Sequence, residues 1–107
     1  MAFIDEYSMV ITTCADYESA KRLADIVVRA RLAACVQLFQ IESIYRWNDD
    51  VCDENETILH IKTKTALYDR LATAIKEHHP YEVPEIIRLP ITGGLPEYLR
   101  WVDENTE

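Results

Sequence analysis

Apolar residues recur along the chain at two different spacings, and these spacings predict its strands and helices. The run Tyr7–Thr13 is apolar and β-branched, which is typical of a strand buried on at least one face. Asp16 then supplies a side chain that can cap a helix, and apolar residues follow at helical spacing from Ala20 through Val27. We expect this first helix to end near Leu32.

The next apolar run, Val36–Trp47, contains no proline or glycine and is long for a strand, because strands usually have about five or six residues. A strand of this length is expected to extend beyond its own sheet toward a neighbouring subunit. Its pattern also changes phase, as a β-bulge or a strand buried on both faces would require. One face carries Val36 and Leu38, whereas the other carries Phe39, Ile41, Tyr45 and Trp47.

Turn-forming and alternating residues predict a hairpin in the middle of the chain. Asn48–Asp50 is expected to be a turn, and Val51–Asn55 an acidic hairpin tip. The alternation over Glu56–Thr63 then predicts a strand antiparallel to the long one. A second helix, capped by Thr65 and ending near His79, carries at helical spacing the residues Leu67, Leu71, Ala74, Ile75 and His78.

Prolines and glycines divide the last third of the chain. Three prolines stiffen residues 80–90, and Glu85–Leu89 within this segment is expected to form a short fourth strand. Gly93 and Gly94 are the only glycines of the chain and predict a turn. Pro96 suits the first turn of a last helix, whose expected buried stripe is Leu95, Tyr98, Leu99 and Val102.

The order strand, helix, strand, strand, helix, strand is that of the ferredoxin-like, or split βαβ, arrangement of the α+β class, with a C-terminal helix added. We therefore expect an antiparallel sheet with two helices on one face. The opposite face needs a cover, and the aromatic residues of the long strand favour homo-oligomerisation as that cover. The chain has no repeats or linkers, so residues 1–107 are expected to form a single domain.

Composition and charge narrow the functional classes. With 19 acidic and 11 basic residues, the formal net charge of −8 disfavours nucleic acids and anionic membranes as partners and favours cations or basic protein surfaces. There is no apolar run of about eighteen residues, and Met1 to Tyr7 lacks the basic start of a signal peptide, so we expect a cytoplasmic protein. Three cysteines without a Cys-x-x-Cys pair argue against a disulfide framework or a structural zinc site.

His78 and His79 are candidate metal ligands, because neutral imidazole binds copper and zinc. Adjacent side chains diverge on a helix and point to opposite sides of a strand, so one chain does not easily aim both at a single ion. Capping the end of the second helix is the alternative role for either histidine. Cys14, at the end of the first strand, either offers a thiolate to a soft cation or packs as a small buried hydrophobic residue.

A second group of polar and aromatic residues flanks the expected strand ends. A pocket at a subunit boundary lined by Lys62, Tyr81 and Glu82 would suit an anion or a small metabolite, and the same side chains would equally form interface hydrogen bonds and salt bridges. No phosphate-binding glycine loop, nucleophile elbow or His-Glu-x-x-His pair is present, so we do not expect an enzyme. The whole group comprises Tyr45, Trp47, Lys62, Tyr81, Glu82 and Glu85.

Five short motifs agree with the pattern of one protein family. The most distinctive is His-His-Pro-Tyr-Glu-Val-Pro-Glu-Ile at residues 78–86, and the others are Ala33–Val36, Ser43–Trp47, Lys62-Thr63 and Leu89–Ile91. Together they resemble the CutA family, the divalent-cation tolerance proteins. The motifs fall in the family's order and spacing and cover about residues 8 to 102.

The resemblance implies homotrimers of ferredoxin-like subunits whose strands continue the sheets of their neighbours, similar to the trimers of PII signalling proteins. It also implies copper ligands at two histidines, matched by His78 and His79, and at a cysteine near the end of the first strand. Thr12 aligns with that cysteine, and Cys14 lies two residues later. The expected function is that of a trimeric cytoplasmic protein that binds copper or another divalent cation in metal tolerance. The alternative is a PII-like, non-catalytic trimer that binds a small metabolite or a protein partner in clefts between subunits.

Overall fold

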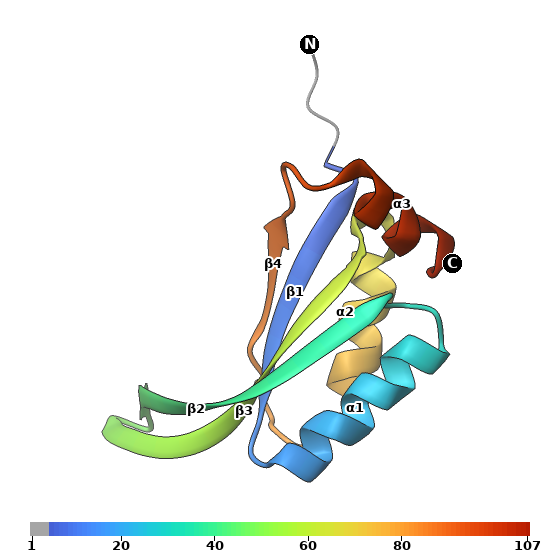
Figure 1. Cartoon of the computed structure of the whole chain (residues 1–107). Coiled ribbons are helices and arrows are strands. Elements are labelled where there is room, and N and C mark those ends of the chain that lie inside the picture. The colour runs from blue at the N-terminus through green and yellow to red at the C-terminus, as the bar shows by residue number, and fades with distance from the viewer. Residues whose placement is uncertain (1–4) are drawn as a thin grey trace.

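The strands and helices follow the expected order. In a computed structural model that describes residues 5–107, the chain forms a four-stranded antiparallel sheet with α1 and α2 on one face (Figure 1). The ferredoxin-like arrangement is confirmed, and residues 1–4 of the N-terminal stretch assessed for a signal peptide lie outside the described residues. The elements are β1 (Tyr7–Cys14), α1 (Tyr17–Arg29), β2 (Cys35–Trp47), β3 (Asp50–Lys64), the short 3-10 helix η1 (Thr65–Leu67), α2 (Tyr68–Glu77), β4 (Ile86–Pro90) and α3 (Pro96–Glu104).

The sheet has the strand order β2-β3-β1-β4, so β2 and β4 are its edge strands. The pairing of β2 with β3 continues without interruption over all 13 residues of β2, and the predicted β-bulge is therefore wrong. The helices cover only the first part of β2, where Val36 and Leu38 pack against the core, and burial of the strand on both faces stays a prediction. Beyond that part, β2 and β3 extend past the helices (Figure 1).

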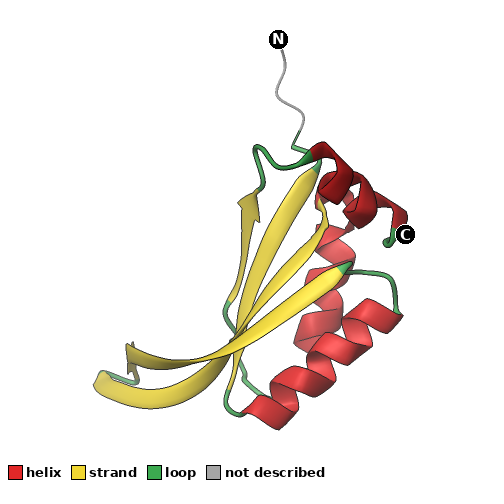
Figure 2. Ribbon diagram, in the orientation of Figure 1, coloured by secondary structure: helices red, strands yellow, loops and turns green. Residues whose placement is uncertain are grey.

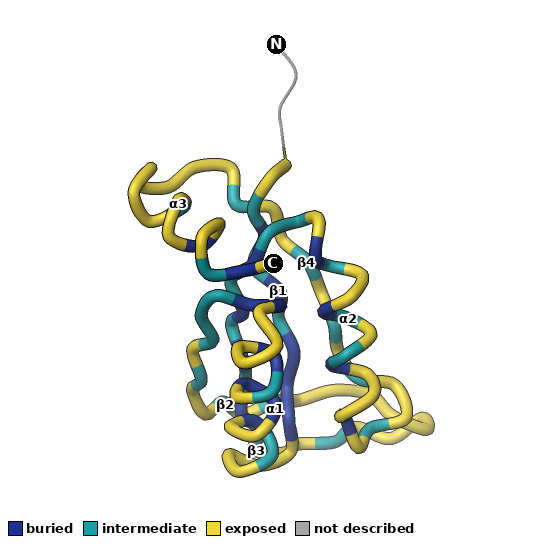
Figure 3. The backbone as a smooth tube through the Cα atoms, turned by 90° about the vertical axis from the view of Figure 1, so that its right-hand side faces the viewer, coloured by how far each residue is buried: buried dark blue, intermediate teal, exposed yellow. Residues whose placement is uncertain are grey.

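The core lies between the sheet and helices α1 and α2. Every second residue of β1 and β3 points toward the helices, and Val10, Leu59 and Ile61 are completely buried. Figure 3 shows the buried residues gathered along β1, whereas the outer turns of the helices are exposed. The predicted apolar face of α1 is confirmed by the burial of Ala20, Leu23, Ala24 and Val27.

Single residues determine both ends of α1. The Asp16 carboxylate accepts a hydrogen bond from the Ser19 amide at 2.7 Å, so the predicted N-cap is confirmed. The helix ends at Arg29 rather than near Leu32, because Arg31 has a left-handed conformation with φ of 59°. The Leu32 amide bonds back to a carbonyl of the last turn at 3.0 Å, and this Schellman motif closes the helix.

The hairpin between β2 and β3 turns at Asn48 and Asp49, whose φ values are 50° and 65°. Two consecutive left-handed residues are typical of a type I′ turn, whose twist matches that of the flanking strands. The segment Val51–Asn55 was expected to be the hairpin tip, and this is wrong, because it belongs to β3 and places Glu54 opposite Ser43 of β2. Its acidic side chains do not prevent pairing, because they reach solvent from this part of the hairpin.

Two turn and cap predictions also change. Thr65 does not cap α2, because η1 intervenes and the Thr65 hydroxyl bonds to the Ser8 hydroxyl at 2.6 Å. Gly93 and Gly94 lie in an irregular segment, and neither has a positive φ. A side chain at position 94 would be crowded, because a Cβ atom there would lie 3.3 Å from the Leu99 side chain.

Helix α3 is more exposed than its sequence pattern predicts. Val102 is the buried residue of its stripe, whereas Leu95 and Tyr98 are 63% and 40% exposed, so their predicted burial is wrong. The helix lies beside β3 at one end of the sheet. Its outer side therefore has no other element against it within residues 5–107.

Two surfaces of the sheet have no cover within the described chain. Residues 41–56 form the outer part of the β2–β3 hairpin, which extends past the helices and contains no buried residue (Figures 1 and 2). We call this part the arm. The open face is the sheet face opposite α1 and α2, and its residues Phe39 and Ile87 are 46% and 48% exposed. The apolar residues of the open face are Met9, Ile11, Phe39, Ile41, Ile58, Ile87 and Leu89.

Candidate functional site

The three predicted metal ligands lie around one cavity at the end of β1. Cys14 is the last residue of β1, and His78 and His79 directly follow the last residue of α2. The cavity has a volume of about 410 Å³, and residues of α1 and α2, including Arg22 and Glu77, complete its wall. We call it the Cys14 cavity.

The Cys14 thiol is almost fully buried, since 1% of the residue is exposed. Burial, followed by the negative charges of Asp16 and Glu56, raises the pKa of the thiol to about 11. The thiol is therefore protonated near neutral pH, and a metal ion that binds it must displace a proton. In this state Cys14 packs as a small hydrophobic residue of the core, in agreement with the second interpretation of the sequence.

His78 is the C-cap residue of α2, as one of the two sequence interpretations predicted. Its Nδ1 donates a hydrogen bond to the Ala74 carbonyl oxygen at 2.9 Å. This bond fixes the orientation of the ring and leaves the lone pair of Nε2 for another partner. A ring nitrogen held by a backbone carbonyl is common among histidines that bind metals through the opposite nitrogen.

His79 is held through both ring nitrogens, and the residue is 8% exposed. Its Nε2 donates to the Thr13 carbonyl oxygen at 2.6 Å, and its Nδ1 accepts a hydrogen bond from the Tyr81 amide at 3.2 Å. These bonds require the neutral tautomer with its proton on Nε2. A metal ion can reach this side chain at Nδ1 only by replacing the Tyr81 amide.

The chemistry of these donors fits a soft or borderline cation, because copper and zinc prefer thiolate and imidazole ligands. Over residues 5–107, no group of three His, Cys, Asp or Glu side chains is placed so that it could hold one metal ion. Cys14, His78 and His79 thus surround a common cavity without converging on one point. Side chains must move before all three can bind the same ion.

A larger cavity, of about 690 Å³, lies between the arm and the segment that precedes β4. We call it the arm cavity. Lys62 was predicted to belong to this group but lies elsewhere on β3, where its Nζ donates to the Gln37 side chain. The pocket predicted for Lys62, Tyr81 and Glu82 lies at a subunit boundary, so it stays a prediction. The predicted residues that do line it are Tyr45, Trp47, Tyr81, Glu82 and Glu85.

Sequence reasoning missed two carboxylates of the arm cavity, Glu54 and Glu56. They had been assigned to a hairpin tip and to the first residue of a strand, so their common face was not recognised. The signal was present in the alternation of β3, since counting back from Ile58 in steps of two reaches Glu56 and then Glu54. Both side chains therefore belong to the open-face side of the hairpin.

Tyr81 lies between the two cavities. Its amide bonds to His79, and its hydroxyl donates to Glu56 Oε2 at 3.0 Å. Burial and this hydrogen bond raise the pKa of Tyr81 well above its usual value. A hydrogen bond to Glu54 raises the pKa of Tyr45 to about 12. Both phenols are therefore neutral hydrogen-bond donors near neutral pH.

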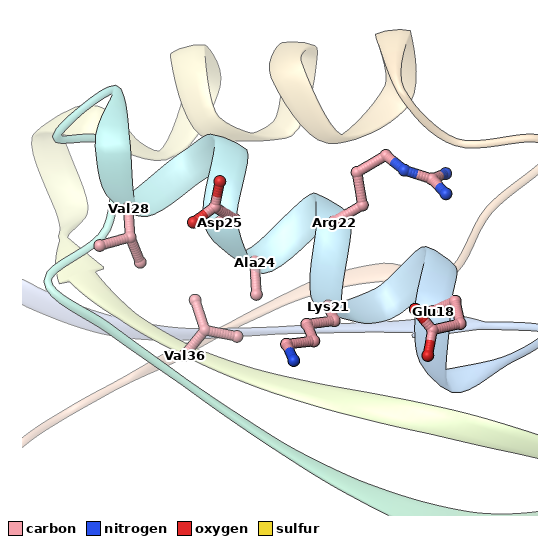
Figure 4. Close-up of a pocket in the computed structure, with 7 residues that line it drawn as sticks. All are labelled: Glu18, Lys21, Arg22, Ala24, Asp25, Val28 and Val36. Atoms are coloured by element: carbon pink, nitrogen blue, oxygen red, sulfur yellow. The ribbon is translucent and has the colours of Figure 1, made fainter.

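A third hollow, of about 530 Å³, lies between α1 and β2 (Figure 4). The Val36 side chain points from β2 toward Ala24 and Val28 on α1, and together they form an apolar floor. The charged residues around this floor are Glu18, Lys21, Arg22 and Asp25, so their charges balance. The hollow contains none of the residues predicted to bind a ligand.

Comparison with known proteins finds relatives over nearly the whole chain. The family model described as CutA1 divalent ion tolerance protein matches residues 8–105. Protein CutA of Mus musculus is 44% identical over 101 residues, which cover 94% of this chain and 57% of that protein. The chain spans 54% to 66% of the length of the first three curated relatives that it matches.

Solved structures agree with the fold. CutA1 from Oryza sativa has a TM-score of 0.93 at 41% identity, and the match covers 95% of this chain and 94% of that chain. The periplasmic divalent cation tolerance protein CutA from Archaeoglobus fulgidus has a TM-score of 0.93 at 32% identity, with 94% and 99% covered. None of the helices in residues 5–107 has the length and apolar character needed to cross a bilayer. This chain belongs to the CutA1 family of divalent ion tolerance proteins.

Proposed function

We propose that this protein is a cytoplasmic homotrimer that binds copper and contributes to the tolerance of divalent cations. Its membership of a divalent ion tolerance family supports the general role. The observation that carries copper binding is the meeting of Cys14, His78 and His79 around one cavity. The role is binding rather than catalysis, and copper is the cargo. The three free cysteines suit the reducing conditions of a cytoplasm.

Each proposed ligand contributes in a different way. His78 offers Nε2 without losing its bond to Ala74, so it is the ligand that needs the least rearrangement. The Cys14 thiol must lose a proton, and copper stabilises the thiolate because sulfur is a soft ligand. His79 joins the site through Nδ1 after its bond to the Tyr81 amide is exchanged for the metal.

Trimer formation is supported by the surfaces that lack a cover. The arm contains no buried residue, and an isolated two-stranded hairpin is at best marginally stable in water. The edge strand β2 is 13 residues long, and every second residue directs its backbone N–H and C=O groups away from β3, which makes a long unprotected edge. Pairing with neighbouring subunits would satisfy this edge and would cover the apolar residues of the open face.

A calorimetric titration with copper tests the proposed ligands. Cys14→Ser and His78→Ala should each weaken binding by at least about tenfold, because each removes a donor atom. Two matched variants remove the same donor types outside the cavity. Cys52→Ser changes a thiol of the arm, and His60→Ala changes an imidazole of the open face. Both controls should bind copper as the wild type does.

His79→Ala completes the experiment. A loss similar to that of His78→Ala is expected if Nδ1 exchanges the Tyr81 amide for the metal. Equal affinities for the wild type and all three cavity variants would overturn the proposed ligand set. A wild-type protein without saturable copper binding would overturn the metal-binding function itself.

A further inference from the structure

His79 is joined to the arm by two hydrogen bonds that both involve Tyr81. The Tyr81 amide donates to His79 Nδ1 at 3.2 Å, and the Tyr81 hydroxyl donates to Glu56 Oε2 at 3.0 Å. We propose that Tyr81 and Glu56 are positioning residues that keep metal ions from Nδ1 of His79, so that breaking the bond between them strengthens copper binding. This inference rests on the proposed function, because His79 is one of the proposed copper ligands.

The two hydrogen bonds start and end on neighbouring strands of the sheet. His79 Nε2 donates to the Thr13 carbonyl oxygen of β1 at 2.6 Å, whereas Glu56 belongs to β3. In the pairing of these strands Thr13 lies opposite Ile58, close to Glu56. The His79 and Tyr81 rings also contact each other, since their centroids are 4.7 Å apart. The sheet therefore fixes the imidazole and the phenol relative to each other.

Nδ1 is the nitrogen of His79 that has a lone pair, because Nε2 carries the proton donated to Thr13. Pro80 has no amide proton, so Tyr81 carries the first backbone donor after His79. This donor occupies the lone pair of Nδ1. Copper must displace it, and the backbone at Tyr81 must then move. The bond between the Tyr81 hydroxyl and Glu56 opposes this movement.

The proposed trimer would strengthen the bond between Glu56 and Tyr81. Both residues belong to one chain, so the bond does not need a neighbouring subunit. Glu56 lies at the inner end of the arm, which neighbouring subunits would cover. Hydrogen bonds are stronger in the protein interior than in water. Assembly would thereby restrain His79 more firmly.

Hydrogen exchange of the metal-free protein tests whether this bond holds the amide on His79. In Tyr81→Phe, the amide of residue 81 should exchange about two- to tenfold faster, because the ring is kept and the bond to Glu56 is lost. Tyr45→Phe is the matched control. It removes a phenol that bonds to another carboxylate of the arm, Glu54, and should leave exchange at residue 81 unchanged. The amides of β1 should exchange at the wild-type rate in both variants.

Two substitutions of Glu56 separate its hydrogen bond from its charge. Glu56→Ala removes both, whereas Glu56→Gln removes the charge and keeps an oxygen that accepts the bond from the Tyr81 hydroxyl. Exchange at residue 81 should be faster in Glu56→Ala and close to the wild-type rate in Glu56→Gln. Equal acceleration by both substitutions would assign the effect to charge and overturn the positioning role.

Calorimetric titration with copper measures the consequence for binding. Tyr81→Phe should bind copper about two- to tenfold more tightly than the wild type, because Nδ1 of His79 is released more easily. Tyr45→Phe should bind as the wild type does. The gain should vanish when Tyr81→Phe is combined with His79→Ala, because a double-mutant cycle isolates the effect that passes through His79. Circular dichroism confirms that each variant is folded.

Three further results would overturn the proposal. The first is unchanged exchange at residue 81 in Tyr81→Phe. The second is copper binding by Tyr81→Phe that is equal to or weaker than that of the wild type. The third is a gain that persists without His79. A wild-type protein that does not bind copper would overturn the metal-binding function, whereas faster exchange in Tyr81→Phe would still support the restraint on His79.

Discussion

At the scale of single residues, the Thr12 hydroxyl lowers the stability of the fold. It is completely buried, and its hydroxyl is the one buried side-chain polar atom of residues 5–107 without a hydrogen-bond partner. Leaving such a group unpaired costs about 1 to 3 kcal/mol. Thr63 has the same burial on β3 but donates to the Leu32 carbonyl oxygen at 2.6 Å. The two threonines therefore share complete burial and differ in whether the hydroxyl has a hydrogen-bond partner.

Thr12→Val should raise the free energy of unfolding by about 1 kcal/mol, because it replaces an unpaired hydroxyl with a methyl group of similar size. Thr63→Val should lower it by about 1 kcal/mol, because it removes a hydrogen bond. Urea denaturation of both variants measures the difference. Destabilisation by Thr12→Val as large as that by Thr63→Val would contradict this account.

The buried thiol of Cys14 makes stability depend on alkaline pH. Its pKa is raised from 9.0 to about 11 by burial. The protonated thiol is therefore favoured in the folded state, and its contribution is complete below pH 9 and is lost as pH rises toward 11. Over this range the wild type should lose on the order of 2 kcal/mol more than Cys14→Ala. Urea denaturation of both proteins at several pH values measures this loss. An equal change of the free energy of unfolding with pH in the wild type and in Cys14→Ala would contradict it.

Sequence reasoning succeeded at residues whose role is local. Asp16 was identified as a cap because capping depends on residues three positions apart. It did not predict the bond of His79 to Thr13, because Thr13 lies 66 residues away in sequence. It also ended α1 too late, since the left-handed Arg31 stands where a glycine would normally mark the end.

At the scale of elements, the length of β2 in the arm was predicted correctly, but the extent of its partner strand was not. The long run without proline or glycine indicated the over-long β2 correctly. Its partner strand was cut short, because the acidic residues of Val51–Asn55 were taken for a loop. The pairing that overrides this local preference is set by the two-residue turn at Asn48 and Asp49.

Asp49→Gly should stabilise the hairpin. Asp49 has a φ of 65°, and glycine adopts this region without the steric cost of a side chain. Asn-Gly is also a preferred pair for type I′ turns. The free energy of unfolding should rise by about 0.5 to 1 kcal/mol in urea denaturation. Asp50→Gly is the control. Position 50 begins β3, where glycine is unfavourable, so this change should lower the free energy of unfolding. Equal effects of both changes would exclude the turn as the cause.

At the scale of the whole molecule, the sequence predicted the fold because local patterns determine the order of its elements. The positions of the two cavities could not be predicted in this way, since each joins segments that are distant in sequence. The Cys14 cavity joins the end of β1 to the end of α2, and the arm cavity joins the arm to the segment before β4. Residue types indicated most members of each site, and within the single chain Lys62 does not line the arm cavity.

The proposed trimer would cover both the open face and the arm. Ile87→Glu should dissociate the proposed trimer, because a charge buried in an apolar interface costs several kcal/mol. Ile87 is 48% exposed on the open face. Val28→Glu introduces the same charge at a residue of α1 that is 39% exposed and lies on the other side of the sheet. This control should keep the mass of the wild type in sedimentation experiments.

Sedimentation equilibrium of the unmodified protein at micromolar concentration tests the central claim most directly. The expected mass is three times that of the 12.4 kDa chain. A mass equal to that of one chain would contradict it, because the arm and the open face would then remain in contact with water.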